Sequence, residues 1–414
     1  MEVLPGCVLK RNNNNITVDS FWDPVNFLSI HVHDNFNNKI MPILDLVVNR
    51  IMKNANRVCL QLSGGLDSTV LFFSIKENWK LIQQFTVINY LDRSVASTDE
   101  SKYAKSLANE SKIELIFHEL KYGFEPKINI KWNRPHPALL GIDSKKALLH
   151  ALGRDGIDLV NGHGGDQLFL ENIDESFLVD YFIDNGFKGF WNILKKISLI
   201  KRSTIFSHSY PAFKSLLGHY IHLNPSYDTF LLPERKDWFT DELDNLICSN
   251  IYLPPFWNKL INSNIKPGKI KHILDVYHGA AFSSFEFPGI TEVYPYLFQP
   301  IVELGLSFPV YETFNEQWTR LHFRQAAATK FNTDKVWRHY KGEWSGVMQS
   351  CIRANMKRVE ELCMEGQFAR NKLIHKDLLR KHIQHCAHGK IDQQWLILQL
   401  LSLELWFESW SEII

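Results

Sequence analysis

A short alternation of apolar and other residues is the clearest structural signal in the chain. Val58, Leu60 and Leu62 occupy every second position of residues 57–62, and this period of two predicts a β-strand. A mostly apolar stretch of helical character follows over residues 70–75. The pattern therefore predicts a strand, a tight turn and a helix in immediate succession.

The same kind of alternation recurs along the first half of the chain. Further strands are expected over residues 84–90, 113–118 and 157–161, and helices over 40–52, 99–111 and 144–152. Strands that alternate with helices indicate a doubly wound parallel sheet, with helices on both faces and right-handed crossovers. From about residue 175 onward the pattern is mostly helical. Residues 1–38 look irregular, and we expect them to lie as an arm on the main body.

The turn between the first strand and its helix reads Ser63-Gly64-Gly65-Leu66-Asp67-Ser68. Two adjacent glycines let the backbone approach an anion closely. A helix N-terminus presents free N–H groups and the positive end of its dipole to phosphate. Ser63 and Ser68 add hydroxyl donors, and Asp67 and Ser68 are favoured N-cap types at the expected helix start. A plain Gly-Gly turn is the alternative, but strand, loop and helix in this order favour a loop that grips the pyrophosphate end of ATP.

Two aspartates are candidate metal ligands. Asp67 does not suit a phosphate directly, and we expect it to hold Mg²⁺, which takes oxygen ligands. A second glycine-rich turn, Gly162-His163-Gly164-Gly165-Asp166, follows the strand expected over 157–161. The carboxyl ends of parallel strands share one edge of a sheet, so Asp67 and Asp166 should face one space and suit a Mg²⁺ pair that bridges ATP phosphates. Asp166 as a capping turn residue is the alternative; the shared edge favours the metal.

Composition narrows the class of protein. The 414 residues suffice for a large core, and 45% hydrophobic with 22% charged residues is an ordinary globular balance. The formal net charge of +1 gives no sign of a nucleic-acid partner, and no apolar run approaches the length of a membrane span. Six scattered cysteines without a Cys-x-x-Cys pair, and no visible secretory signal, favour a reducing, cytoplasmic location.

Together with segments further along the chain, the two glycine-rich turns resemble the synthetase domain of asparagine synthetase and its relatives. These relatives include β-lactam-type synthetases and the macrolactam cyclases that make lasso peptides. Residues 294–304 resemble the family's Pro-Phe-Leu-Asp-x-x-Leu-Val-Glu segment, and residues 323–327 and 336–342 resemble its Leu-Arg-x-Ala and Arg-x-x-Lys-Gly ending. The resemblance spans about residues 57–345. It implies an ATP-pyrophosphatase (adenine nucleotide α-hydrolase-like) fold and an enzyme that adenylates a carboxylate with ATP and Mg²⁺, then couples it to an amine.

The front of the chain resembles the connector that follows the glutaminase domain in asparagine synthetase, through residues 2–7 and 21–24. Cys7 lies inside this connector-like segment and is not expected to be a glutaminase nucleophile, so glutamine cleavage is not expected. The implied domains are an arm over 1–38 that follows a missing glutaminase domain, and a synthetase domain over 39–414, with a nucleotide core over about 55–175 and a helical substrate part over about 176–414.

The resemblance also implies roles for individual residues. Lys341 falls where the family keeps a catalytic lysine, which would stabilise negative charge at the α-phosphate or at the tetrahedral intermediate; a solvated surface lysine is the alternative. His163 is the natural base for an incoming ammonium group, or else a polar turn residue that orients its neighbours. The residues placed at the nucleotide are Leu60, Ser63, Gly64, Gly65, Asp67, Ser68, Val87, Gly162 and Gly164.

Within the family, His163 before Gly-Gly-Asp, and Lys-Gly after the arginine, look most like lasso-peptide cyclases. Asparagine synthetase usually carries an acidic residue at the position of His163, and β-lactam-type synthetases a tyrosine. We therefore expect a macrolactam to close between the N-terminal amine of a peptide precursor and an Asp or Glu side chain, with a leader peptidase as a candidate partner. The alternatives are an ammonia-dependent asparagine synthetase, a β-lactam-type synthetase, and a non-catalytic binding partner in a peptide-processing complex.

Overall fold

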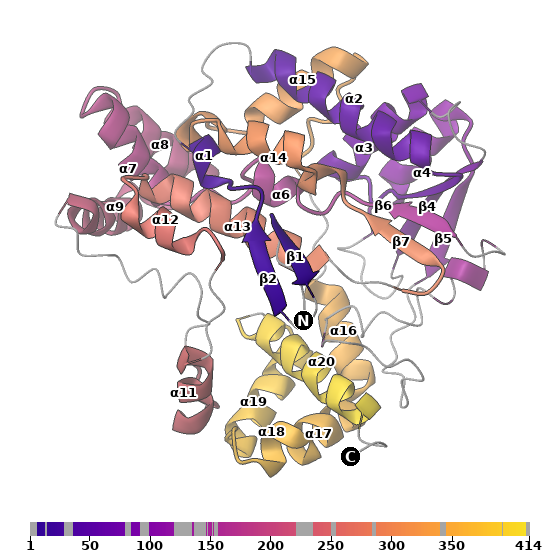
Figure 1. Cartoon of the computed structure of the whole chain (residues 1–414), viewed down its shortest axis with the longest axis vertical. Helices are drawn as coiled ribbons and strands as arrows, with labels where there is room; N and C mark the ends of the chain where they lie inside the picture. Colours follow the sequence, from indigo (N-terminus) through magenta and orange to yellow (C-terminus); the bar gives the residue numbers. More distant parts are fainter. Residues whose placement is uncertain are drawn as a thin grey trace.

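The chain folds into an upper lobe, built around a sheet, and a smaller lower lobe of helices (Figure 1). The computed structural model describes residues 6–12, 15–28, 36–78, 84–91, 99–119, 135, 146, 148–150, 152, 156–220, 235–249, 254–283, 287–339, 345–390 and 392–410. No helix within these residues is long and apolar enough to cross a membrane.

A five-stranded sheet with the order β5-β4-β3-β6-β7 forms the centre of the upper lobe. Its strands are β3 (Arg57–Gln61), β4 (Gln84–Leu91), β5 (Leu115–Glu119), β6 (Ile157–Val160) and β7 (Ile290–Val293). Every neighbouring pair is parallel, which confirms the expected doubly wound α/β architecture. The chain runs outward from β3 to β4 and β5, then returns to add β6 and β7 on the other side of β3. The strand order therefore reverses between β3 and β6, and the turns after these two strands open at that reversal.

The alternation along β3 divides its side chains between two cores. Val58, Leu60 and Leu62 belong to the main core, which also takes residues from α2 (Phe36–Asn54), α3 (Leu66–Asn78) and α15 (Leu321–Phe331). Cys59 points into a second core on the opposite face of the sheet. Burial raises the pKa of its thiol to about 12, so it behaves as a small buried hydrophobe, as its place in a strand suggests.

The other expected elements of the nucleotide core are also present, with ends shifted by a few residues. The expected helix over 99–111 is α4 (Ser101–Ser111), and within the expected helix over 144–152 the described residues 146, 148–150 and 152 are helical. Strand β7 was not expected, because it is four residues long in a region whose pattern is mostly helical. Pairing with β6, from Ile157 opposite Ile290 onward, makes it a strand.

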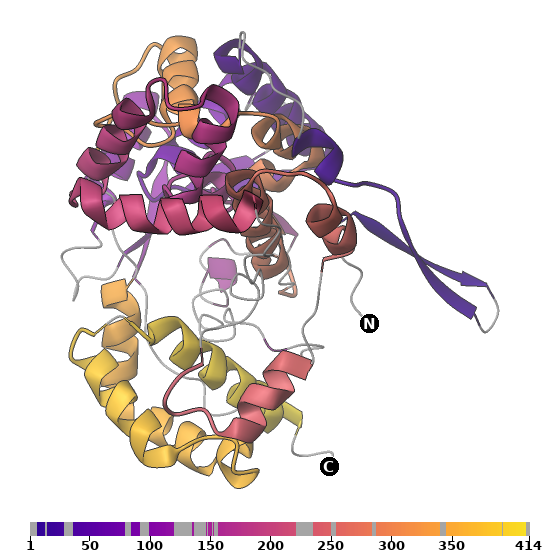
Figure 2. The same ribbon diagram turned by 90° about the vertical axis from the view of Figure 1, so that its left-hand side faces the viewer.

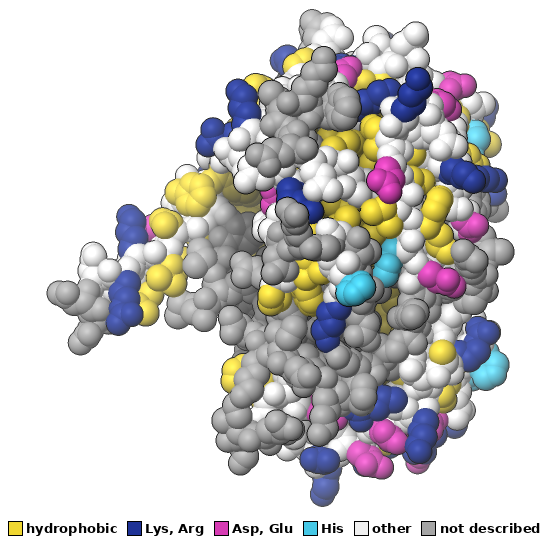
Figure 3. All heavy atoms as spheres, turned by 90° about the vertical axis from the view of Figure 1, so that its right-hand side faces the viewer, with side chains coloured by type: hydrophobic (Ala, Val, Ile, Leu, Met, Phe, Trp, Pro, Cys, Tyr) yellow, Lys and Arg dark blue, Asp and Glu magenta, His cyan; other side chains and the backbone are white. Residues whose placement is uncertain are grey.

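The expectation of an irregular arm is wrong for the first described residues. β1 (Cys7–Asn12) and β2 (Asn15–Ser20) form an antiparallel hairpin that is mostly exposed. Figures 2 and 3 show the hairpin standing away from the body instead of lying on it. The two strands pair with each other, and the backbone groups on their outer edges are left to bond with water, because the hairpin is mostly exposed. The residues that come after the hairpin in the chain pack against the body. Trp22 donates its Nε1–H to Glu303 at 2.7 Å, and α1 (Val25–Leu28) buries the side chains at both of its ends.

The remaining helices surround the sheet or build separate cores. In the upper lobe they are α6 (Gly165–Leu168), α7 (Ser176–Asn185), α8 (Phe190–Ile200), α9 (Ile205–Tyr220), α12 (Trp257–Asn262), α13 (Pro267–Ser283) and α14 (Gln299–Leu306), with 3₁₀ turns η4 (Pro295–Leu297) and η5 (Val310–Glu312). The lower lobe holds α11 (Asp241–Ser249), α16 (Ser345–Ala354), α17 (Met356–Glu365), α18 (Gln367–Arg370), α19 (Lys376–Ala387) and α20 (Gln394–Trp410). Helices α7 to α9 share one hydrophobic core and the lower lobe another, so the region after residue 175 is helical as expected.

Candidate functional site

The two glycine-rich turns meet at the reversal of strand order, as the sequence predicts. Asp67 lies in the first turn of α3, after β3, and Asp166 lies in α6, after β6. Their carboxylates are joined by one guanidinium group: Arg320 donates from Nη1 to Asp166 at 2.6 Å and to Asp67 at 3.0 Å, and makes a further short contact with Asp67 through Nη2. The aspartates therefore face one space, with a cation between them.

Arg320 is buried, with 2% of its side chain exposed, and sequence reasoning missed it. Burial acts to lower the pKa of its guanidinium, but Asp67, Asp166 and Glu171 outweigh burial and raise it. The backbone of Arg320 is left-handed, with φ of +57°, just before α15 begins. Its buried Nε–H has no acceptor among the described residues. Arg320 thus carries a fixed positive charge next to the first glycine-rich turn, and its Nε–H can still donate a hydrogen bond.

Hydroxyl groups hold the first loop in shape. Gly65 donates its N–H to the Oγ of Ser63 at 3.1 Å, and Ser68 donates its hydroxyl to the carbonyl of Gly65 at 3.2 Å. The two serine oxygens lie 3.0 Å apart. Because α3 begins at Leu66, Asp67 and Ser68 lie within its first turn, and the expectation that they cap the helix is wrong. Both serines brace the loop, while the first N–H groups of α3 remain the natural donors to a phosphate.

The second turn depends on glycine at two positions. A Cβ at Gly162 would lie 2.7 Å from the Cβ of Asp67, so only glycine lets the two turns approach this closely. Gly164 has φ of +91°, and a side chain there would also collide with Leu297. The glycines of this turn therefore bring its backbone against Asp67.

His163 has a hydrogen-bond partner in α13. Its Nε2 lies 2.9 Å from the carbonyl oxygen of Gly279 in α13, and its ring packs edge-to-face against Tyr294 with centroids 5.7 Å apart. A carbonyl can only accept, so a neutral His163 carries its proton on Nε2 and leaves Nδ1 as the basic nitrogen. Its own N–H is held by the side chain of Asn161, at the end of β6.

Arg338, in the segment 336–342 that resembles the family's Arg-x-x-Lys-Gly ending, contacts the first glycine-rich turn. Its guanidinium donates to the carbonyl of Gly64 and, at 2.6 Å, to Glu100 at the start of α4, and it stacks 3.4 Å from the ring centroid of Tyr103. The arginine of the Arg-x-x-Lys-Gly segment thus holds the first glycine-rich turn through the carbonyl of Gly64. Lys341, which follows shortly in the sequence, lies outside the described residues, so its catalytic role stays a prediction.

Two more residues support the site and were missed. Tyr296, fully buried, donates its hydroxyl to the carbonyl of Asp67 at 2.9 Å, and burial followed by the Asp67 charge raises its pKa well above the usual value. Asn89, two residues before the end of β4, donates to the carbonyl of Leu62 at 2.7 Å. Its buried Oδ1 has no partner among the described residues. Tyr296 lies within the segment 294–304 whose resemblance was recognised, whereas nothing in the sequence marks Asn89.

Leu60 and Val87 lie side by side at the centre of the sheet, on β3 and β4. Both side chains are fully buried in the main core. Their contact with a nucleotide stays a prediction.

The residues present fit Mg²⁺ bound together with phosphate. Asp67 and Asp166 offer hard oxygen ligands, and the guanidinium between them shows that the pair holds positive charge. The part of the chain that the structure describes contains no group of three or more His, Cys, Asp or Glu side chains arranged to hold a metal ion. A Mg²⁺ ion here would therefore complete its coordination with phosphate oxygens and water, as is usual for this ion.

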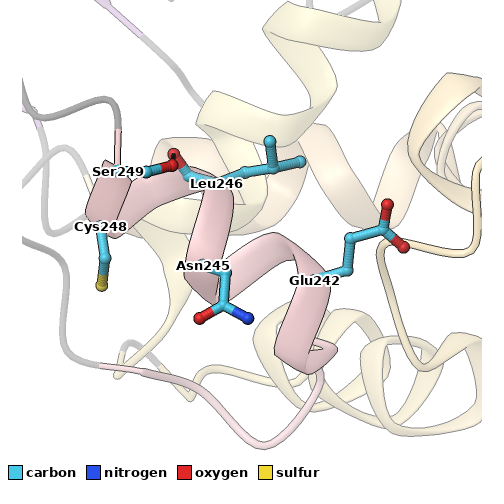
Figure 4. A pocket seen from close by; sticks show the side chains of 5 residues that line it. All are labelled: Glu242, Asn245, Leu246, Cys248 and Ser249. Atoms are coloured by element: carbon cyan, nitrogen blue, oxygen red, sulfur yellow. Dashed lines mark hydrogen bonds between the residues drawn. The ribbon is translucent and has the colours of Figure 1, made fainter.

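A hollow lies on α11 in the lower lobe, lined by Glu242, Asn245, Leu246, Cys248 and Ser249 (Figure 4). All of these side chains come from one helix, and none lies in the glycine-rich turns or in the segments 294–304, 323–327 and 336–342. The site at the strand reversal therefore remains the candidate for chemistry.

Two known proteins are similar to parts of this chain. Microcin J25-processing protein McjC from Escherichia coli is 24% identical over 333 residues, which cover 74% of this chain and 55% of McjC. The chain thus matches little more than half the length of this relative. The U34-tRNA thiolase NcsA from Methanococcus maripaludis matches 62% of this chain and 85% of its own at 15% identity, with a TM-score of 0.26, too low to support an inference.

The sequence model of asparagine synthase matches residues 39–169 and 289–408, which are more than half of the chain and include Asp67, His163, Asp166 and Arg320. The earlier resemblance is thereby confirmed, and the chain belongs to the asparagine synthase family of ATP-dependent ligases.

Proposed function

We propose that this chain binds ATP with Mg²⁺ at the reversal of strand order and uses it to join a carboxylate to an amine. One observation carries the proposal: Asp67 and Asp166, from two separate glycine-rich turns, meet on Arg320 beside the N-terminus of α3. Two carboxylates, a buried arginine and free helix N–H groups suit a polyphosphate with its metal ion.

The reaction would proceed in two displacements. An oxygen of the substrate carboxylate attacks the α-phosphorus of ATP, and pyrophosphate leaves with the electrons of the broken P–O bond. The amine nitrogen then attacks the acyl carbon, and AMP leaves as the amide forms. Mg²⁺, when bound, would neutralise charge on the departing pyrophosphate. The chain's own donors for the same charge are the N–H groups of α3 and, by family resemblance, Lys341.

His163 is suited to accept the proton that the attacking amine must lose. The Gly279 carbonyl fixes the ring through Nε2 and so keeps Nδ1 as the free acceptor. The ring stays oriented by its edge-to-face contact with Tyr294.

For the substrate, we propose a peptide that supplies both groups, so that the product is a macrolactam. Two observations favour a peptide: the similarity to a protein whose name describes the processing of microcin J25, and the histidine at position 163. Holding both ends of one peptide at the site makes ring closure intramolecular, which can supply much of the rate. An amino acid substrate, giving asparagine or a small lactam, is the second candidate.

Pyrophosphate release from ATP and Mg²⁺, followed by mass spectrometry of the product, tests the proposal. The panel contains free aspartate with ammonia, and leaderless peptides with an internal Asp or Glu, each with and without a leader peptidase. A peptide that loses one water is the expected product. Asparagine as product would reassign the substrate, and no release anywhere on the panel would favour a non-catalytic binding partner.

Variants of the two aspartates test whether the activity belongs to this site. Asp67→Asn and Asp166→Asn should each lower the rate of pyrophosphate release at least about a hundredfold, because each removes a negative charge that balances the metal ion. Asp377→Asn, on the exposed start of α19, is the matched control and should leave release unchanged. Full activity of both site variants would contradict the assignment.

A further inference from the structure

The segment from residue 186 to residue 220 has a charge unlike that of the rest of the chain. It contains no Asp or Glu, although the whole chain balances 46 basic against 45 acidic residues. Its basic residues are Lys188, Lys195, Lys196, Lys201, Arg202 and Lys214. Lys201 pairs with Glu175, the residue directly before α7, whereas Lys188, Lys195, Arg202 and Lys214 are exposed and make no ion pair with any described residue. Helices α8 and α9 therefore form a positive surface.

The outer side of α9 is apolar and open to solvent. Its exposed side chains are Phe206 (85% exposed), Tyr210 (72%), Phe213 (64%) and Leu217 (47%). Their spacing of four, three and four residues places them in one stripe along the helix. Figure 2 views the molecule from this side, with α9 in front of the other helices of the upper lobe.

Helix α8, which packs against α9, and the turn before it expose further apolar side chains. Phe187 is 79% exposed, Trp191 68% and Leu199 49%. Trp191, Lys195 and Leu199 follow one another at four-residue intervals, so a basic side chain lies between two apolar ones. We call the exposed apolar and basic side chains of residues 187–217 the α8–α9 surface.

The inner side of the same helices is firmly attached. His208 of α9, 5% exposed, lies 2.8 Å from Glu175 through Nδ1 and 2.5 Å from the hydroxyl of Ser203 through Nε2. Lys201 binds the same carboxylate at 2.7 Å. These contacts tie α9 and the corner after α8 to α7, so the α8–α9 surface is held outward on a fixed support.

We propose that the α8–α9 surface binds the face of an anionic lipid bilayer. Aromatic and leucine side chains next to lysines, with no acidic residue between them, are the composition of helices that lie in the membrane interface. Anionic headgroups attract such basic clusters, and lysine stems let the ammonium groups reach the headgroups while the apolar parts enter the boundary. The breadth of the surface, over two helices and a turn, suits a plane better than a single bound peptide. This inference does not depend on the proposed enzymatic reaction.

Vesicle sedimentation with the full chain tests the proposal. Binding to vesicles that contain phosphatidylglycerol should exceed binding to pure phosphatidylcholine at least about tenfold, and should weaken as salt is added. The variant Phe206→Ser/Phe213→Ser should bind at least about tenfold less, and so should Lys195→Ala/Lys214→Ala. All four side chains are exposed, so unchanged urea midpoints confirm that these variants fold.

Trp395→Ser is the matched control, since Trp395 is 62% exposed on α20 in the lower lobe; it should bind vesicles like the unaltered chain. Three results would overturn the proposal: no sedimentation with either lipid, equal binding to both lipids, or binding that the double variants leave intact. If the protein bound no vesicles but bound an acidic amphipathic peptide through the α8–α9 surface, the surface would be assigned to a peptide partner instead.

Discussion

Replacing Arg320 with methionine should destabilise the protein by about 3 kcal/mol at neutral pH. The arginine is 2% exposed and bridges Asp67 and Asp166, with Glu171 3.7 Å away. Removing one partner of a buried ion pair costs about 3–5 kcal/mol, because the remaining charges stay desolvated and uncompensated. The side chain of Asp166 keeps 35% of its surface exposed and can hydrate, which places the expected loss at the lower end of that range.

Urea denaturation at several pH values measures this loss. The difference between the two proteins should narrow as the pH falls into the range where carboxylates protonate, because a neutral carboxyl group needs no counter-charge. Mg²⁺ should restore part of the lost stability in Arg320→Met, since it can replace the missing cation between the two aspartates.

The matched control is Arg380→Met, which breaks an exposed pair with Asp377 on α19. Such surface pairs contribute about 0–1 kcal/mol, so this variant should unfold close to the unaltered chain. If Arg320→Met were as stable as Arg380→Met, the reasoning that the two turns are held together by one buried guanidinium would be refuted.

Three further changes probe the loop, the second turn and a buried histidine. Arg338→Ala removes the guanidinium that holds the Gly64 carbonyl and should weaken ATP binding about tenfold by calorimetry; unchanged affinity would show that the loop needs no such support. Gly164→Ala should lower the free energy of unfolding by more than about 2 kcal/mol, because φ is +91° and the side chain of Leu297 fills the space a Cβ would need. Gly156→Ala, at φ of +80° with open space around it, should lower it by only about 1 kcal/mol. Equal losses in the two variants would contradict the packing argument. Burial lowers the pKa of His272 to about 3, so the folded state binds fewer protons than the unfolded chain, and stability should fall by about 1.4 kcal/mol per pH unit as pH drops below about 6.5. In His272→Gln that part of the slope should vanish, and an unaltered pH profile would exclude His272 as its source.

Local patterns were sufficient for the parts of this protein that depend on sequence neighbours. The period of two along 57–62, the glycine pair and the apolar stretch after it predicted β3, its loop and α3, because strand faces and helix starts follow from adjacent residues. The same reasoning placed the second glycine-rich turn at the same sheet edge, since parallel strands share their direction. It failed at the hairpin of residues 7–20 and at β7, whose strand structure comes from pairing.

The sequence by itself thus determined the α/β fold, the family and the two aspartates of the site. Only the tertiary structure decided what surrounds them: Arg320 is 154 positions from Asp166 and 253 from Asp67, yet it bonds to both. No local sequence pattern identifies such a residue, because its role depends on where the fold places its charge, between two turns that are distant in the sequence. The same holds for Arg338 on Gly64 and for Gly279 behind His163, which are positioned by packing across the sheet edge instead of by their neighbours in the chain.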